Sequence, residues 1–519
     1  MNVLNATRTI ARAGLLRPLR PDRYVAAARS YRAYGATLAG ACSSAAALYG
    51  PDPALIDASG VRTFTQLNDD TNALAHALSN RGITCGRYVG ICARNHSAFV
   101  EIAVALSKLG AHAVLLNTSM SGAQLIDVIA REAVAAVITD PEFIDALRPI
   151  GHLVLLITTE ETSQWTTIHT TSPLPKPASA GRTVILTSGT TGAPKGASRG
   201  APTAPTTATG VLDAIPYHCG EPMLIAAPLF HAWGFAHIAI AFTLGCPIVL
   251  QPKFDPLATI AAIAQFRVGV LVAVPVMLRR MLELPLTEHH DHNVSSLRIV
   301  PLSGSAIPAG LAEAFMDRFG EVVYNLYGST EVGSATVATP EDLRAAPGTA
   351  GRPTSGIDIR ILDANDNQVS TGIRGRIVVS SPLVFDGYTN GENKAIIDGY
   401  MSTGDIGHLD HLGRLYVDGR DDDMIISGGE NVYPREVEDL LASHPDIVEA
   451  SVIGVDDAEF GQRLHAFVVR SPDSAIDTAV VQAFVRDHLA RFKVPRGVTF
   501  LDTLPRTATG KVVKRELPS

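Results

Sequence analysis

The segment Thr187–Gly196, TSGTTGAPKG, constrains this chain more than any other part of its sequence. It follows Thr183–Leu186, a short apolar run rich in β-branched residues that predicts a buried strand. Glycines let backbone N–H groups approach an anion, while hydroxyl groups and Lys195 add hydrogen-bond donors and a positive charge. The strand and loop therefore predict a phosphate-binding segment.

This loop differs from the Walker A loop of nucleotide-binding proteins. Pro194 precedes the lysine and Gly196 follows it, so a helix starting at the lysine is disfavoured. A mobile loop that covers phosphate groups fits better. A solvated Gly/Ser/Thr linker without a ligand is the alternative for an isolated match.

Composition limits the classes of protein that the chain can represent. Its 519 residues exceed what one core usually supports, so we expect roughly three domains or subdomains. The net charge of −8 predicts no nucleic-acid partner. Five cysteines without a C-x-x-C pair indicate neither a zinc site nor a disulfide framework, and we expect a cytoplasmic protein.

Residues 1–45 are predicted to form a basic N-terminal arm. The first 32 residues carry seven arginines and one acid, Asp22. Three interpretations stay open: a surface helix on an anionic membrane, a transit peptide, or an arm that packs on the body. Pro18 and Pro21 prevent a single continuous helix.

Apolar runs alternate with helical patterns from residue 51 to residue 181, which predicts βαβ units around a largely parallel sheet. Examples are strands at 88–92 and 113–116 and a helix at 99–109, and further strands are expected at 222–227, 268–274, 297–301 and 322–325.

After residue 351, short strands at 357–362 and 376–380 predict a smaller β-rich subdomain. The acidic run DGRDDD at 418–423 marks a boundary, and beyond it we expect a compact α+β domain. These boundaries divide the chain into a large body at 46–418, a connecting segment at 419–423 and a C-terminal domain at 424–519. In the last, helices are expected at 434–443 and 479–490, and strands at 450–455, 464–470 and 497–501.

Further polar segments follow the predicted strands. The turn at 303–306 (SGSA) and the segment at 324–331 (YNLYGSTE) bring glycines, hydroxyls, an aromatic ring and a carboxylate, which suit purine stacking and Mg²⁺ coordination. The segment at 402–405 (STGD) offers a carboxylate for ribose hydroxyls, and Arg420 suits ribose or phosphate. Taken singly, a turn cap and a surface ion pair are equally good explanations.

In their order and spacing, these segments resemble the adenylate-forming superfamily of acyl-CoA synthetases, aryl-CoA ligases, peptide-synthetase adenylation domains and firefly-type luciferases. The resemblance covers residues from about 50 to 515. It rests on TSGTTGAPKG, YGSTE, STGD, YVDGRDDDMIISGGENVYP and PRTATGK. It implies an α/β fold: a large N-terminal body of two α/β subdomains plus a distorted β-barrel, followed by a small mobile α+β domain.

The resemblance also implies ATP, Mg²⁺ and CoA as cofactor and co-substrates. It gives catalytic roles to Lys511, Glu331, Thr187 and His231, with Glu331 as the metal ligand, and it places the hinge at Asp422. The residues implied in ATP binding are Thr187, Ser188, Gly189, Thr190, Thr191, Gly192, Lys195, Ser305, Ala306, Tyr327, Gly328, Ser329, Thr330, Asp405, Arg420 and Lys511. Those implied in CoA binding are Gly428, Gly429, Phe492 and Arg496.

The chemistry supports these roles. Attack of a carboxylate on the α-phosphate of ATP joins two anions, so fixed positive charge is needed at the transition state. Mg²⁺ on Glu331 and the ammonium of Lys511 supply it, each worth on the order of 3 kcal/mol when desolvated. A lysine on a mobile domain can leave afterwards and let a thiol reach the adenylate.

The acid is expected to be a medium- or long-chain fatty acid, with an aryl acid as the alternative. Peptide-synthetase domains have an aspartate where this chain has Phe230 and His231, so an amino acid would lack its counter-ion. His231 is expected to orient the carboxylate or gate the thiol, with a core histidine as the other possibility. The predicted pocket residues are Phe230, His231, Trp233, Val274, Pro275, Gly328 and Val332.

CoA is the expected acyl acceptor. The alternative within the superfamily is a fatty-acyl-AMP ligase that passes the acyl group to a carrier protein, and a luciferase-type oxygenase is a third. A non-catalytic nucleotide sensor is expected to lack Lys511 or Glu331, and both are present.

Overall fold

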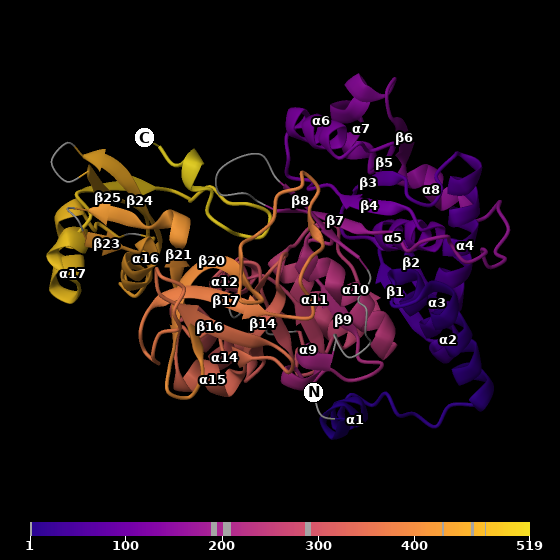
Figure 1. Cartoon of the computed structure of the whole chain (residues 1–519), viewed down its shortest axis with the longest axis horizontal. Helices are drawn as coiled ribbons and strands as arrows, with labels where there is room; N and C mark the ends of the chain where they lie inside the picture. The colour runs from indigo at the N-terminus through magenta and orange to yellow at the C-terminus, as the bar shows by residue number, and fades with distance from the viewer. Residues whose placement is uncertain are drawn as a thin grey trace.

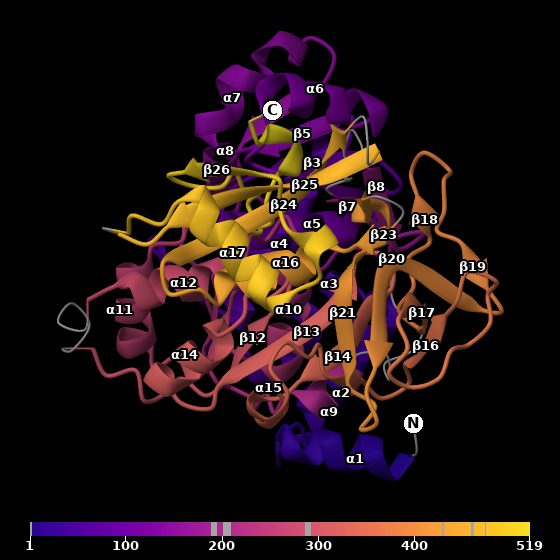
Figure 2. The same cartoon turned by 90° about the vertical axis from the view of Figure 1, so that its left-hand side faces the viewer.

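The structure of the chain is a computed structural model that describes residues 3–187, 195–200, 209–285, 292–427, 430–457, 461–472 and 474–518. Figures 1 and 2 show a large body and, at one side of it, a smaller lobe built by the C-terminal part of the chain, drawn in yellow. The predicted α/β architecture is confirmed.

The first layer of the body is a seven-stranded sheet with the order β18-β8-β7-β4-β3-β5-β6. The strands from β7 to β6 are parallel, whereas β8 runs antiparallel to β7 and β18. Helical crossovers join the parallel strands, as such pairing requires. The strands are β3 (Tyr88–Cys92), β4 (His112–Leu115), β5 (Ala136–Thr139), β6 (Leu155–Thr158), β7 (Thr183–Thr187), β8 (Lys195–Arg199) and β18 (Gly387–Tyr388), and the helices are α4 (Phe64–Asn80), α5 (Ser97–Leu109), α6 (Gly122–Arg131), α7 (Pro141–Leu147) and α8 (Thr159–Trp165).

The phosphate loop is shorter than the predicted Thr187–Gly196. Thr187 ends β7 and Lys195 begins β8, because these two residues pair across an antiparallel hairpin. Pairing satisfies backbone groups that a longer loop would leave without partners. Ser188, Gly189, Thr190, Thr191 and Gly192 lie outside the described residues.

The second layer is a five-stranded sheet with the order β11-β9-β10-β1-β2. Bridges from Val270 to Ile299 and from Ala273 to Leu302 continue it into a four-stranded sheet, β12-β13-β14-β15. The strands are β1 (Pro53–Asp57), β2 (Gly60–Thr63), β9 (Met223–Ile225), β10 (Ile248–Val249), β11 (Val270–Val272), β12 (Val300–Leu302), β13 (Val323–Ser329), β14 (Gly333–Ala338) and β15 (Arg352–Pro353). The helices are α9 (Thr209–Ala214), α10 (Ala232–Leu244), α11 (Pro256–Phe266), α12 (Pro275–Glu283), α14 (Leu311–Phe319) and α15 (Pro340–Ala345).

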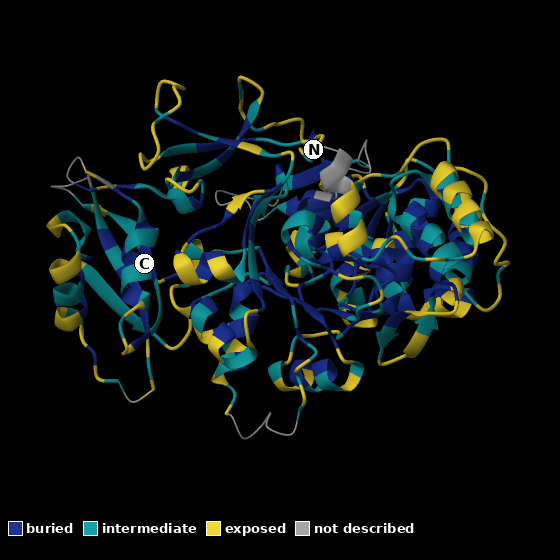
Figure 3. Ribbon diagram, turned by 90° about the horizontal axis from the view of Figure 1, so that it is seen from below, coloured by how far each residue is buried: buried dark blue, intermediate teal, exposed yellow. Residues whose placement is uncertain are grey.

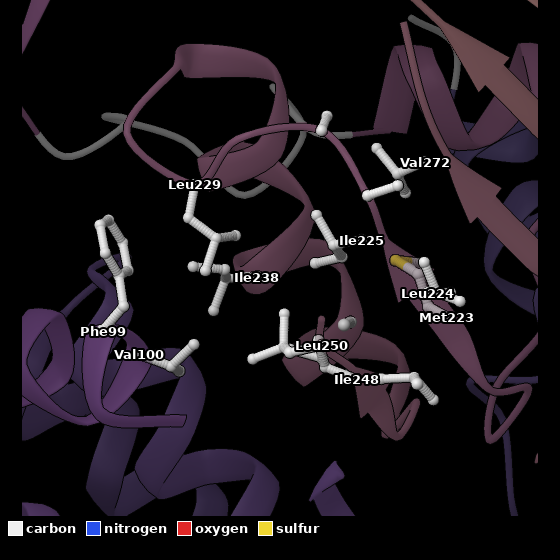
Figure 4. Close-up of a cluster of buried hydrophobic side chains, with 14 of the residues drawn as sticks. Phe99, Val100, Met223, Leu224, Ile225, Leu229, Ile238, Ile248, Leu250 and Val272 are labelled. Atoms are coloured by element: carbon white, nitrogen blue, oxygen red, sulfur yellow. The ribbon is translucent and has the colours of Figure 1, made fainter. Parts of the chain in front are cut away.

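Buried apolar side chains join the two layers. In Figure 4, Phe99 and Val100 of α5 face Leu229 and Ile238, and each of these four side chains has no exposed surface. Figure 3 shows buried residues concentrated along the strands and the inner faces of the helices. The core therefore fixes the loops at the ends of both sheets.

The predicted β-rich subdomain is a sheet of β16-β17-β20-β19 with β21 paired to β20. Its strands are β16 (Asp358–Leu362), β17 (Gly375–Ser380), β19 (Ile396–Ile397), β20 (Tyr400–Leu409) and β21 (Leu415–Arg420). A 3₁₀ turn at Asp421–Asp423 then leads out of this sheet.

The C-terminal lobe has a core of its own, as expected for a separate α+β domain. Its sheet has the order β23-β22-β25-β24, with β26 paired to β25. Its strands are β22 (Ile425–Ser427), β23 (Glu430–Val432), β24 (Ile447–Asp457), β25 (Gly461–Arg470) and β26 (Gly497–Leu501), and its helices are α16 (Pro434–Ala442) and α17 (Thr478–His488).

The N-terminal arm forms α1 (Val3–Arg12), α2 (Pro21–Tyr34) and α3 (Leu38–Tyr49), and it packs on the body. Arg12 donates to the carbonyl of Leu212, and Arg17 donates to that of Cys219. Helix α3 runs through the predicted boundary after residue 45 and is partly buried. Within the described ranges, no helix combines the length and apolar character needed to cross a bilayer. Contact of the arm with a membrane surface stays a prediction.

Candidate active site

Asp405 and Arg420 face each other as register partners on β20 and β21. The guanidinium Nη1 lies 3.5 Å from Oδ1 of Asp405, and the hydroxyl of Tyr327 donates to Oδ2 over 2.6 Å. Burial raises the pKa of Asp405, while the bond from Tyr327 and the charge of Arg420 oppose that rise. The predicted ribose-binding pair is thus a preformed cluster with a tyrosine.

Arg420 also contacts the predicted hinge. Its Nε donates to Oδ1 of Asp422 over 3.0 Å. One guanidinium therefore contacts both Asp405, the predicted ribose ligand, and Asp422, where the chain leaves the body. That Asp422 acts as a hinge stays a prediction.

Glu331 is a buried carboxylate whose position is fixed by two hydrogen bonds. Oε1 accepts a hydrogen bond of 2.5 Å from the hydroxyl of Tyr388, and the Glu331 amide donates to Oγ of Ser329 over 3.2 Å. Burial alone would raise the pKa of Glu331, but the bonds with Tyr388 and Ser329 outweigh it and the pKa is lowered. The side chain is therefore an anion at neutral pH.

A single buried carboxylate suits the magnesium site that the sequence implies. Mg²⁺ usually keeps several waters and is held by one or two carboxylates together with substrate phosphates. The described part of the chain contains no cluster of three or more acidic, histidine or cysteine ligands. Glu331 thus fits an ion that is shared with ATP rather than one enclosed by protein ligands.

Lys511 lies at the end of a tight turn and among the charged groups of the body. Burial lowers its pKa, as does the charge of Arg420, while Asp405 and Glu331 oppose this shift. By its solvent-accessible surface, Lys511 is nevertheless an exposed residue. The preceding residue, Gly510, is so close to the body that a Cβ there would lie 2.7 Å from Cγ1 of Val276.

The lysine of the predicted phosphate hairpin pairs with a carboxylate at the surface. Oγ1 of Thr187 donates to the carbonyl of Lys195 over 3.2 Å, and Nζ of Lys195 lies 2.5 Å from Oε2 of Glu392. The same ammonium is 5.6 Å from the ring centroid of Tyr388. Lys195 therefore has a carboxylate partner that phosphate would have to replace.

The residues predicted to bind the adenine and the α-phosphate follow β12 or lie on β13. Ser305 and Ala306 follow Gly304, which has a φ of +95°. Tyr327, Gly328 and Ser329 belong to β13 itself, where the pairing with β14 is irregular. A Cβ at Gly328 would lie 2.0 Å from the carbonyl oxygen of Gly333, so only glycine fits there.

Sequence reasoning missed two side chains of this region. Arg199 donates over 2.7 Å to the carbonyl of Thr330, and burial lowers the pKa of Arg199. Tyr388, the partner of Glu331, was also missed. Gly387-Tyr388 lies in a turn-rich stretch, and nothing in its spacing indicates a contact with residue 331.

His231 precedes the first residue of α10, and one nitrogen of its imidazole ring is buried in the protein. Its Nε2 is buried and has no hydrogen-bond partner among the described residues. Burial, with a smaller effect of Lys511, lowers its pKa to about 4. The imidazole is therefore neutral, and a buried polar atom without a partner suits a ligand.

The other predicted pocket residues divide into two groups. Phe230 packs on His231 with ring centroids 4.8 Å apart, and Nε1 of Trp233 donates to the carbonyl of Ala273 over 3.0 Å. Val274 and Pro275 are buried at the start of α12. Val332 instead lies in the core of the β-rich subdomain.

The predicted CoA residues occupy the C-terminal lobe. Phe492 packs on the core of the lobe, and Arg496 is exposed. Their neighbour Lys493 pairs with Glu436 at 2.7 Å. Gly428 and Gly429 lie outside the described residues. Binding of CoA by these residues stays a prediction.

Comparison with known proteins agrees with this geometry. Residues 42–389 match the family of AMP-binding enzymes, and residues 436–511 match the AMP-binding enzyme C-terminal domain. Indoleacetate–CoA ligase from Aromatoleum aromaticum is 34% identical over 476 residues, which are 88% of this chain and 92% of the relative. 2-Succinylbenzoate–CoA ligase from Geobacillus kaustophilus is 36% identical over 475 residues, which are 89% of this chain and 94% of the relative.

Among solved structures, o-succinylbenzoate CoA synthetase from Bacillus subtilis, in complex with the acyl-adenylate intermediate OSB-AMP, superposes with a TM-score of 0.82 at 29% identity. The match covers 92% of this chain and 98% of that protein. The fold, the grouped site residues and the two matched domains lead to one conclusion: the chain belongs to the AMP-binding enzyme family of the adenylate-forming superfamily.

Proposed function

We propose that the protein is an aryl-CoA ligase. It uses ATP and Mg²⁺ to convert an aromatic or arylalkyl carboxylic acid into its acyl-adenylate, releases pyrophosphate, and transfers the acyl group to CoA. The observation that carries the proposal is the grouping of two carboxylates: Asp405 is held by Arg420 and Tyr327, and Glu331 by Tyr388. The charge of Lys511 acts on both carboxylates and on His231.

Each residue has a task in this reaction. Asp405 and Arg420 hold the ribose, and Lys195 and Thr187 hold the β- and γ-phosphates. His231 presents its unpaired Nε2 to the acid, and Lys511 stabilises the charge that develops at the α-phosphate. When bound, Mg²⁺ adds positive charge at the phosphates, and Glu331 is the residue that would hold it.

An aryl acid now has more support than the fatty acid that the sequence favoured. The relatives named above carry the names of indoleacetate and 2-succinylbenzoate ligases. Phe230 places an aromatic ring beside His231, and Trp233 of the same segment packs on His237 with ring centroids 4.4 Å apart. Aromatic side chains in this segment suit a planar ring. Leu229 and Ile238 of the same segment are fully buried in a packed core (Figure 4), so a long alkyl chain that entered there would have to displace them.

A panel of acids tests the proposal. The protein is incubated with ATP, Mg²⁺, CoA and one acid at a time: indoleacetate, 2-succinylbenzoate, anthranilate, octanoate or palmitate. We expect AMP, pyrophosphate and a CoA thioester with at least one aryl acid, at a higher kcat/KM than with either fatty acid. A preference for octanoate or palmitate would overturn the aryl assignment. Adenylate that accumulates without thioester would instead favour a carrier-protein acceptor.

A further inference from the structure

The carboxylate of Glu449 lies between two guanidinium groups from different parts of the molecule. Nη1 of Arg279, on helix α12 of the body, is 2.8 Å from Oε1. Nη2 of Arg506, in the C-terminal lobe, donates to Oε2. The three side chains are only 16%, 17% and 23% exposed for Arg279, Glu449 and Arg506, so water screens these charges weakly.

Arg506 in turn holds the lysine-bearing turn. Its Nη1 donates to the carbonyl oxygen of Gly510, which directly precedes Lys511. The turn closes on itself, because the amide of Gly510 donates to the carbonyl of Thr507 and the amide of Thr507 donates to the carbonyl of Lys511, each over 2.8 Å. The orientation of Arg506 therefore fixes the peptide from which the Lys511 side chain extends.

Helix α12 contacts the same turn directly. Gly510 has a φ of +82°, and a Cβ there would lie 2.7 Å from Cγ1 of Val276. Val276 and Arg279 are three residues apart, so they lie on one face of α12. This face therefore carries both the steric contact with the turn and the ion pair with Glu449.

We infer that Glu449 is a positioning residue that makes the placement of Lys511 depend on docking of the C-terminal lobe against α12. With Arg279 in place, the Glu449 carboxylate is held where it orients Arg506, and Arg506 holds the Gly510 carbonyl. The inference rests on the proposed function, in which Lys511 acts in adenylate formation. Glu449 therefore serves the first half-reaction and is not needed for thioester formation.

The Glu449→Gln variant tests this assignment, since glutamine keeps the shape of the side chain and loses its charge. We expect kcat of adenylate formation, followed by rapid quench with ATP and an accepted acid, to fall on the order of 10-fold, with little change in KM. Conversion of supplied acyl-adenylate and CoA to thioester should stay within about two-fold of the wild-type rate. A residue that only stabilises the fold would slow both steps together.

Two further variants sharpen the test. Arg279→Gln should show the same selective loss, and the double variant should be little slower than the slower single variant, because the residues act through one contact. Arg280→Gln removes an equal charge from the exposed neighbouring position and should change neither half-reaction. If Glu449→Gln does not fold, the rates of the two half-reactions are compared in Arg279→Gln alone.

The failures of the two proposals are distinguishable. Equal slowing of both half-reactions, or no slowing of either, in Glu449→Gln and Arg279→Gln would overturn the positioning role alone. A wild-type protein that forms no adenylate with any acid of the panel would overturn the proposed function and, with it, this inference.

Discussion

Tyr388 donates a hydrogen bond of 2.5 Å from its hydroxyl to Oε1 of Glu331, although 57 residues separate the two in sequence. Tyr388 pairs with Ala197 of the phosphate hairpin, and its ring lies 5.6 Å from the ammonium of Lys195. One tyrosine thus connects the hairpin with the carboxylate that suits Mg²⁺. Because it donates to the charged form of Glu331, it also helps to lower the pKa of that carboxylate.

We predict that Tyr388→Phe weakens the use of Mg²⁺. Glu331 would lose a charge-assisted hydrogen bond worth about 1.5–3 kcal/mol and would be oriented less firmly. The Mg²⁺ concentration that half-saturates ATP–pyrophosphate exchange should rise on the order of 10-fold. Tyr400→Phe is the matched control, since the Tyr400 hydroxyl donates to the carboxylate of Asp358 at the exposed edge of another sheet. Equal Mg²⁺ curves for both variants would contradict the role of Tyr388.

Lys511→Ala should separate the two half-reactions. Removing a charge that is placed for the transition state typically costs about 10²–10³ in rate, so adenylate formation should fall by about that factor. Supplied acyl-adenylate should still react with CoA, because that step does not use the ammonium. Rapid-quench measurement of each half-reaction checks this. Comparable losses in both steps would mean that Lys511 supports the fold or CoA binding instead.

The strands and the backbone of the site could be predicted from sequence. Apolar β-branched runs such as residues 88–92 and 183–186 have the composition of buried parallel strands, and both form them. The glycines and hydroxyls of the predicted phosphate loop and of YGSTE are typical of places where the backbone approaches a ligand. Such local constraints leave a pattern in neighbouring residues.

Long-range contacts leave no such pattern. Glu449 sits in the ordinary strand sequence VEAS, and its ion-pair partner Arg279 comes from another domain. Arg374 lies 3.2 Å from Asp418 and 3.7 Å from Glu436 of the C-terminal lobe. Glu449 and Arg374 thus contact residues far away in sequence, so one-dimensional spacing could not identify these contacts.

Asn95→Ala should destabilise the body. The Asn95 amide donates to the carbonyls of Ile225 and Ala227 and accepts from the amide of Leu229, so it joins the two layers just before the predicted acyl-pocket segment. The side chain is 6% exposed, and its loss leaves buried backbone groups without partners. We expect the free energy of unfolding to fall by about 1–3 kcal/mol in denaturant titration.

Asn365→Ala is the control for that experiment, because Asn365 is exposed and a surface change usually stays within about 0.5 kcal/mol. Equal unfolding midpoints for the two variants would show that water replaces the Asn95 amide without cost.

The neutral state of His231 predicts how the stability of the protein depends on pH. The pKa of His231 is lowered to about 4 in the folded chain from an ordinary value of 6.5, mainly by burial. Between these values the unfolded chain binds the proton more readily, so acidification lowers the free energy of unfolding, by about 2 kcal/mol for this group at pH 5. Above pH 6.5 the effect disappears because both states are neutral.

His231→Gln removes this dependence, so the variant should gain about 2 kcal/mol relative to the wild type between pH 7.5 and pH 5. The comparison is needed because Glu101 acts in the opposite direction: burial raises its pKa to about 7, and acidification then favours the folded chain. Glu101 is present in both proteins and cancels in the difference. Chemical denaturation of both proteins at the two pH values measures this difference in the free energy of unfolding. Parallel pH curves would mean that His231 accepts its proton in the folded chain, and a neutral imidazole facing the acid would have to be abandoned.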